Sequence, residues 1–328
     1  MTGVKKTSAL LAIVVALGAN ASIANTAEPG KLPRVGLFWL DSRNQPRIDE
    51  FRRALRDLGY VEGSNIVLEY RDAGGKHEKL PSLAAELVRL RVDVILSDGG
   101  AVIRALQDAT KTTPIIMPVM SDPIAGGFVA KPVRPEGNIT GLTNFAPELS
   151  GKRLELLKET VPRVTRVAIL WSSAPVQEAA MKTLETAARS LKVELQSAST
   201  QRGSKDLDTV LEAVIKGRSH ALLTLPDPRL GNERERIVRF ALKNRLPTIF
   251  ATRGFAEAGG LMSYGPDFSY NFRRAATYVD KILKGTKVQD LPVENPMKFE
   301  LIINLKTATA IGVNIPPKVL MWADKVIK

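Results

Sequence analysis

The stretch RVGLFWLDSRNQPRIDEFRRALRDL, residues 34–58, decides the fold class because it joins a strand pattern to a helix pattern. The run RVGLFWL (34–40) is apolar and typical of a β-strand. The run PRIDEFRRALRDL (46–58) is typical of an amphipathic helix, since four apolar residues share one helical face: Ile48, Phe51, Leu55 and Leu58. Gly59 then ends the helix. The stretch therefore predicts one β-strand followed by one α-helix.

The same step repeats along the chain in two series. The first continues with strands at 65–70, 92–96 and 115–119 and helices at 80–90 and 99–109. Residues 137–143 then lead the chain out of this first unit. The second has helices at 152–160, 176–190, 206–215 and 233–244, and strands at 166–171, 193–197, 221–225 and 248–251. A strand at 262–264, a helix at 272–283, a strand near 299–304 and a helix from about 317 complete the chain. Alternating strands and helices predict an α/β fold with parallel sheets. Since 328 residues suit two domains, we expect two Rossmann-like lobes with a ligand cleft between them.

Composition narrows the class of protein. Hydrophobic residues make up 44% and charged residues 25%, as in ordinary globular proteins. Cysteine is absent, which excludes disulfides, thiolate metal sites, cysteine nucleophiles and lipid attachment through cysteine. The two histidines, His77 and His220, precede no nucleophile or metal motif. We therefore expect no metal and no cofactor.

The first 24 residues have the order of a secretory signal. Lys5 and Lys6 precede an apolar run at 9–19, and small residues follow it. We expect residues 1–24 to be a cleaved signal peptide; the alternative is a retained membrane anchor or a buried helix. With no cysteine after the run, the product would not be a lipoprotein, and the periplasm is its expected location.

The net charge of +13 raises the possibility of a nucleic-acid partner. The basic residues, however, are interspersed with acidic ones, as in ERER (233–236), and form no run with interleaved aromatics. A solvated basic surface is therefore the preferred interpretation, and we expect no nucleic-acid partner.

Candidate ligand-binding residues follow the strands, because open parallel sheets bind ligands at the carboxyl ends of their strands. These loops contribute Trp39, Asp41 and Ser42; Ser97, Asp98, Gly99 and Gly100; Ser121 and Asp122; Trp171 and Ser172; Asp227; and Arg253. Aromatic side chains suit the apolar part of an organic ligand, whereas hydroxyls and acids suit its polar groups.

Each of these residue types also has a purely structural interpretation. The tryptophans could pack in the core, and an Asp before proline commonly caps a turn. The Gly pair could serve only the turn, although the helix it opens favours an anion. Arg253 could bind a ligand carboxylate or a neighbouring Glu. We expect an amino acid or similar compact carboxylate with an apolar body, aromatic ones included, whose ammonium meets Asp122 or Asp227. A sugar could stack on the same tryptophans.

Several segments together resemble a known family. They are LGYVEG (58–63), LAAELV (83–88), SDP (121–123), GNITG (137–141), KRLELLK (152–158), EAGGLMSYGP (257–266), AATYVDKILKG (275–285) and FELIINLK (299–306). As a set they resemble the ABC-transporter substrate-binding proteins that include tryptophan and tyrosine binders, from about residue 32 to the end. The resemblance implies a type I periplasmic-binding fold, with two lobes joined by three crossovers and closing by a hinge.

The resemblance also implies lobe boundaries and a general site. One lobe would hold 31–143 plus 265–288, and the other 144–264 plus 289–328. The loops at 97–100 and 120–122 would grip a ligand's carboxylate and ammonium. The chain departs from many relatives at 172–175, where SSAP replaces Asn-Pro-x-Asn, so ligand identity does not transfer.

The expected function is therefore that of a periplasmic substrate-binding protein of an ABC importer. It would act as a monomer and deliver a small-molecule ligand to a membrane permease with its ATPase. One alternative is a ligand sensor or chemoreceptor partner with the same fold. Another is an exported α/β enzyme, but the sequence has neither a Gly-x-Gly-x-x-Gly after the first strand nor a Gly-x-Ser-x-Gly elbow.

Overall fold

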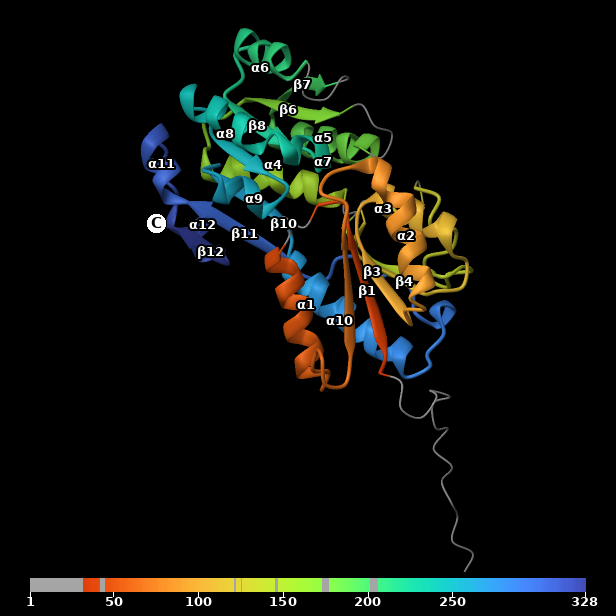
Figure 1. Cartoon of the computed structure of the whole chain (residues 1–328). Helices are drawn as coiled ribbons and strands as arrows, with labels where there is room; N and C mark the ends of the chain where they lie inside the picture. Colours follow the sequence, from red (N-terminus) through yellow and green to blue (C-terminus); the bar gives the residue numbers. More distant parts are fainter. Residues whose placement is uncertain are drawn as a thin grey trace, which may run out of the picture. The chain divides into compact units, whose positions relative to one another are not determined.

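Two sheets, each covered by helices, organise the chain (Figure 1). The computed structural model describes residues 32–41, 45–120, 122–124, 126–144, 147–172, 177–200 and 206–328. The expected signal peptide, Ser42 and Ser121 lie outside these ranges. Within them, no helix is long and apolar enough to cross a membrane.

The first sheet has five parallel strands in the order β2-β1-β3-β4-β5. Their bounds are Arg34–Trp39 (β1), Val67–Asp72 (β2), Val94–Ser97 (β3), Ile115–Met120 (β4) and Ile139–Thr143 (β5). The order reverses at β1, with β2 on one side and β3 on the other. Such a switch point is where open α/β sheets bind ligands.

Helices cover both faces of this sheet. Alternate residues of β1 show this directly, since Leu37 packs with α1 (Gln45–Asp57) and α10 (Phe268–Leu283), while Phe38 packs on the opposite face. That opposite face carries η2 (His77–Lys79), α2 (Leu80–Arg89) and α3 (Gly100–Ala109). The apolar face predicted for residues 46–58 is confirmed by the burial of Ile48, Phe51 and Leu55.

The second sheet has seven strands in the order β12-β11-β10-β9-β8-β6-β7. Their bounds are Arg166–Ser172 (β6), Glu194–Thr200 (β7), Ala221–Thr224 (β8), Thr248–Phe250 (β9), Met262–Pro266 (β10), Phe299–Asn304 (β11) and Lys325–Ile327 (β12). Only the β10–β11 pair is antiparallel. Between β10 and β11 the chain leaves this sheet and forms α10 and η5 before it returns.

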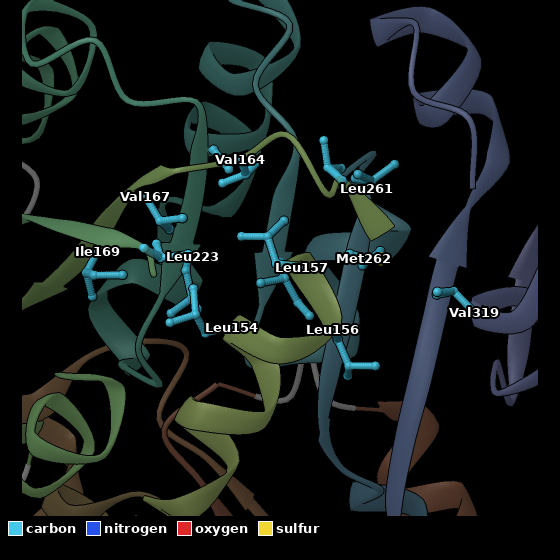
Figure 2. Packing of buried hydrophobic residues seen from close by; sticks show 14 of the residues in the cluster. Leu154, Leu156, Leu157, Val164, Val167, Ile169, Leu223, Leu261, Met262 and Val319 are labelled. Carbon is cyan, nitrogen blue, oxygen red and sulfur yellow. The ribbon is translucent and has the colours of Figure 1, made fainter. Parts of the chain in front are cut away.

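Helices pack on both faces of the second sheet as well. They are α4 (Glu148–Thr160), α5 (Glu178–Leu191), α6 (Leu207–Lys216), α7 (Pro228–Asn232), α8 (Arg234–Lys243), α9 (Arg253–Glu257), α11 (Leu305–Ile311) and α12 (Pro317–Met321). Figure 2 shows Leu154 and Leu157 of α4 among Ile169, Leu223 and Met262 from the strands. The α6, α7, α8 and α9 side chains form the core on the other face.

The chain passes between the two sheets three times. It leaves the first sheet after β5 and returns when β10 leads into α10, which packs on α1 and β4. It leaves again after η5 (Val288–Asp290) to form β11. These passages agree with the three crossovers that the resemblance implies.

The ends of several predicted helices differ in the structure. The helix expected to start at 272 begins at Phe268, because Asp267 caps it by accepting a hydrogen bond from the Tyr270 N–H at 3.1 Å. The C-terminal helix ends at Met321, and the chain then pairs as β12 beside β11. The short helices α7, α9 and α11 were not expected, since fewer than eight residues carry too little periodicity to detect.

Glu294 anchors the last crossover to the first sheet. Its backbone N–H donates to the Gly141 carbonyl, and its carbonyl accepts from the Thr143 N–H, both at 2.9 Å. Its carboxylate accepts from Arg274 Nη2 at 2.6 Å and Nε at 2.9 Å. The hydrogen bonds from Arg274 hold the pKa of Glu294 below its usual value.

We expect Glu294→Gln to lower the free energy of unfolding by about 1 kcal/mol at pH 7, since the pair is only half-buried. A lowered pKa contributes stability above the pKa of the unfolded chain, and this contribution is lost as the pH falls. The difference between variant and wild type should therefore shrink below about pH 4.5. Urea unfolding at pH 7 and pH 3 measures it, with exposed Glu159→Gln as the control. A constant difference at both pH values would exclude the charge pair as its cause.

Candidate functional site

Asp98 lies at the carboxyl edge of the first sheet, directly after β3 and before α3. Gly99 follows with φ +83°, a backbone conformation that glycine adopts without strain, and it precedes the first residue of α3. The turn that the Asp-Gly-Gly sequence forms thus places the Asp98 carboxyl beside the N-terminus of α3. This position agrees with the sequence prediction.

The electrostatics of Asp98 are unusual for a surface acid. Burial raises its pKa to about 6, and the charge of Arg47 opposes that rise only partly. Its side chain nevertheless keeps some exposure. Across the described ranges, it has no hydrogen bond and no ion pair within 4.0 Å. A carboxylate in this environment would be stabilised by a cation that enters the site.

Arg47, which sequence reasoning missed, lies in the first turn of α1, beyond the end of the neighbouring strand β1. Its guanidinium lies over the Phe268 ring, with 4.5 Å between the guanidinium carbon and the ring centroid. Burial lowers its pKa, whereas the charge of Asp98 raises it. The sequence offered one signal, a basic residue in a first helical turn that contains no acid, but only the apolar face of this helix was considered.

A polar network occupies the carboxyl edge of the second sheet. Ser172, at the end of β6, donates its hydroxyl proton to Asp227 and its N–H to Gln177 Oε1 at 2.9 Å. Gln177 in turn donates to the Pro226 carbonyl at 2.9 Å. Asp227 caps α7 by accepting from the Arg229 N–H at 2.6 Å, and the Arg229 side chain pairs with it at 3.2 Å. Gln177 was not identified from the sequence.

Three predicted residues make contacts within their own lobe, and two of them, Trp39 and Ser97, are buried. Trp39 is 2% exposed, and its ring packs 6.0 Å from that of Phe272. Ser97 is fully buried and donates to the Phe38 carbonyl at 2.7 Å, which ties β3 to β1. Asp122 accepts from the Ile124 N–H at 3.0 Å, as the turn-capping interpretation expects. Direct ligand contact by these residues stays a prediction.

The remaining predicted residues lie at the strand ends with partners of their own. Trp171 is half-buried and donates from Nε1 to Ser197 at 2.9 Å. Arg253 donates to Glu257 at 2.8 Å and lies 3.6 Å from Glu300, as the neighbouring-Glu alternative requires. Asp41 is half-buried after β1.

Away from the strand ends, a groove of about 580 Å³ is lined by residues of α4 and α5, which pack against each other. Its lining includes Gly151, Lys152, Lys182 and Thr183, and none of the predicted site residues. Within the described ranges, His, Asp and Glu side chains form no group of three that could hold a metal ion. The strand-end residues are therefore the better candidate site.

Residues 41–327 match the family model described as ABC transporter substrate binding protein. The chain belongs to this family. The match covers both sheets except β1, so the two lobes together are the family's unit. The family consists of substrate-binding proteins rather than enzymes, and its members bind small ligands.

Relatives of this substrate-binding protein support the same assignment. A tyrosine-binding protein from Clostridioides difficile (strain R20291) is 26% identical over 302 residues, which is 90% of this chain and 85% of the relative. A conserved domain protein from Vibrio cholerae has a similar structure, with a TM-score of 0.77, 26% identity and coverage of 90% of this chain and 100% of the other.

Two further solved structures are similar in fold. One is an ABC domain in complex with L-Trp from Streptococcus pneumonia, with a TM-score of 0.79 and 22% identity. The other is a ligand-free, open substrate-binding protein with adhesive properties from Clostridium difficile, with a TM-score of 0.73 and 23% identity. Each covers 90% of this chain, and all of each matched structure is covered. The predicted type I periplasmic-binding fold and the predicted family are confirmed.

Proposed function

We propose that this substrate-binding protein captures an aromatic amino acid between its lobes and delivers it to the permease of an ABC importer. Capture would take place in the periplasm, after removal of the signal at residues 1–24, and the protein would act as a monomer. The lobes would be residues 31–143 plus 265–288 and residues 144–264 plus 289–328. The aromatic class is supported by the names of the tyrosine-binding and L-Trp-bound relatives.

The observation that carries the proposal is the Asp98 carboxyl. It lies at the strand-end edge where sheets of this type bind ligands, and burial raises its pKa to about 6. Burial removes the solvation that stabilises the carboxylate, and the ammonium of an amino acid would replace that stabilisation with an opposite charge. A neutral sugar offers no such charge, and so the acid favours an amino acid over the sugar alternative.

Asp227 is a weaker candidate for the ammonium contact. Its oxygens already accept from Ser172, Gln177 and Arg229. A ligand ammonium would have to share or displace these donors. We therefore assign Asp227 a positioning role, in which it holds the edge of the second sheet in the shape that meets the ligand.

Calorimetry with the proteinogenic amino acids, sugars and nucleosides tests the proposal. We expect one aromatic amino acid to bind with 1:1 stoichiometry and with the highest affinity. Small-angle scattering with the same ligand at saturation should show a smaller radius of gyration, as hinge closure requires. Tight binding of a neutral sugar, with no amino acid bound, would overturn the proposed ligand class.

A further inference from the structure

Arg47 occupies a position that is electrostatically unfavourable for a cation. It lies in the first turn of α1, where the helix dipole already creates positive potential. No acid in that turn compensates the charge. A second positive charge at a helix N-terminus is useful when an anion binds there, because the cation and the N–H groups then act on the same ligand.

The surroundings of Arg47 leave its guanidinium available. Its described contact is the Phe268 ring at 4.5 Å, which supports the flat face of the group and leaves its N–H edges free to donate. In the part of the chain that the structure describes, no carboxylate lies within 4.0 Å of it. The charges that act on it are Asp98 of its own lobe, Glu300 of β11, and Arg253 and Glu257 of α9.

Asn271 provides a second observation, one helical turn along α10 from Phe268. It is fully buried, and among the described residues neither its amide oxygen nor its amide nitrogen has a hydrogen-bond partner. It follows Phe268 by three residues on α10, so both side chains share one face of that helix. Buried amides without partners are rare and indicate a missing polar group. The buried Nε1 of Trp39, whose ring packs against Phe272, likewise has no hydrogen-bond partner among the residues that the structure describes.

We propose that Arg47, the N-terminal turn of α1 and Asn271 form a subsite for the ligand's α-carboxylate. Arg47 donates to the carboxylate through its forked N–H groups, Phe268 orients the guanidinium, and Asn271 donates from its amide nitrogen. Asp98 receives the ammonium. The inference rests on the proposed function and extends it, because it makes recognition depend on both charges of a zwitterion.

Such a pair of subsites discriminates by charge rather than by size. An amine without the carboxylate leaves Arg47 unpaired, and an acid without the ammonium leaves Asp98 unpaired. Since a desolvated charge without a partner is strongly disfavoured, both analogues should bind far more weakly than the amino acid. The aromatic body of the ligand does not enter this distinction.

The test compares Arg47→Met with Arg53→Met, an exposed arginine on the same helix. The probes are L-tryptophan, tryptamine and indole-3-propionate, and L-tyrosine, tyramine and 3-(4-hydroxyphenyl)propionate. Arg47→Met should weaken amino-acid binding at least about 30-fold and abolish the preference over the amine. Arg53→Met should match wild type. If Arg47→Met binds the amino acid within threefold of wild type, the subsite is overturned but the proposed function is not. If wild type binds no aromatic amino acid, phenylalanine included, both are overturned.

Two more variants separate binding from folding. Arg47→Lys keeps the charge but loses the fork, so we expect a loss of affinity smaller than that of Arg47→Met. Asn271→Leu replaces an unpartnered amide with an apolar group of similar size, which should keep or raise the melting temperature. If Asn271 serves the ligand, amino-acid affinity falls while amine affinity does not. Unchanged affinity for both would remove Asn271 from the subsite, and equal losses for both would show that its role is structural.

Discussion

An Asp98→Asn variant should bind its amino acid several hundredfold more weakly than wild type while its free form becomes more stable. The loss of affinity follows from removing one member of a desolvated charge pair, which costs about 2 to 5 kcal/mol. The gain in stability follows from the raised pKa, about 6 against 3.8. After allowance for partial exposure, we expect about 1 to 2 kcal/mol at pH 7.5.

The pH dependence of Asp98 has a defined sign. Because its pKa is raised in the folded protein, the native state binds the proton more tightly than the unfolded chain between about pH 4 and pH 6. Its ionisation therefore lowers the stability of the free protein as the pH rises through that window. Ligand binding requires the carboxylate, so affinity should fall below pH 6 and be about tenfold lower at pH 5 than at pH 8.

Calorimetry and thermal unfolding from pH 5 to pH 8 measure both effects. The Asn variant should show neither the drop in affinity nor the pH-dependent stability. Asp108→Asn, an exposed acid on the helix that follows, is the matched control and should resemble wild type. If Asp98→Asn binds as wild type does, the ammonium is met elsewhere and the assignment of Asp98 is wrong.

Asp227→Ala should lower the free energy of unfolding by about 2 to 4 kcal/mol, the largest stability effect expected at the second strand-end edge. The substitution removes the cap of α7, the acceptor of the Ser172 hydroxyl and one of two acceptors of the Gln177 amide, which keeps the Pro226 carbonyl. It also releases the Arg229 side chain. Several hydrogen bonds to one buried carboxylate are thus lost together.

Guanidinium unfolding measures the stability change, with Asp208→Ala as the control because Asp208 is an exposed acid. Binding separates a positioning role from direct contact. A positioning role predicts equal losses of affinity for the amino acid and for its deaminated analogue. A loss confined to ligands with an ammonium would assign the direct contact to Asp227 instead.

Local patterns predicted most of the fold because hydrophobic periodicity is a property of neighbouring residues. Strands β1 and β4 and helix α2 differ from their predicted bounds by one residue at most. The start of α10 was misplaced by four residues because a side-chain cap, rather than an apolar face, begins it. The final strand β12 was missed because three exposed or half-buried residues become a strand only by pairing with β11.

The candidate site likewise has features that the local sequence predicts and features that depend on distant parts of the chain. The sequence by itself determined the alternation of strands and helices and the family, and it predicted candidate ligand-binding loops at the strand ends, since all of these depend on contiguous residues. It also placed Asp98 correctly at a strand end. What it could not determine was which strand-end side chains are already occupied by partners from distant parts of the chain.

Only the tertiary structure decided that question, because hydrogen bonding, burial and charge depend on which segments meet. Trp39 is enclosed because Phe272, from a helix that returns after the second lobe, packs against it. Arg47 enters the proposed site because that same helix places Phe268 beneath its guanidinium and the charge of Asp98, after β3, acts on it. The residue types were visible in the sequence, but the environment that gives them their chemistry is produced by packing between segments far apart in the chain.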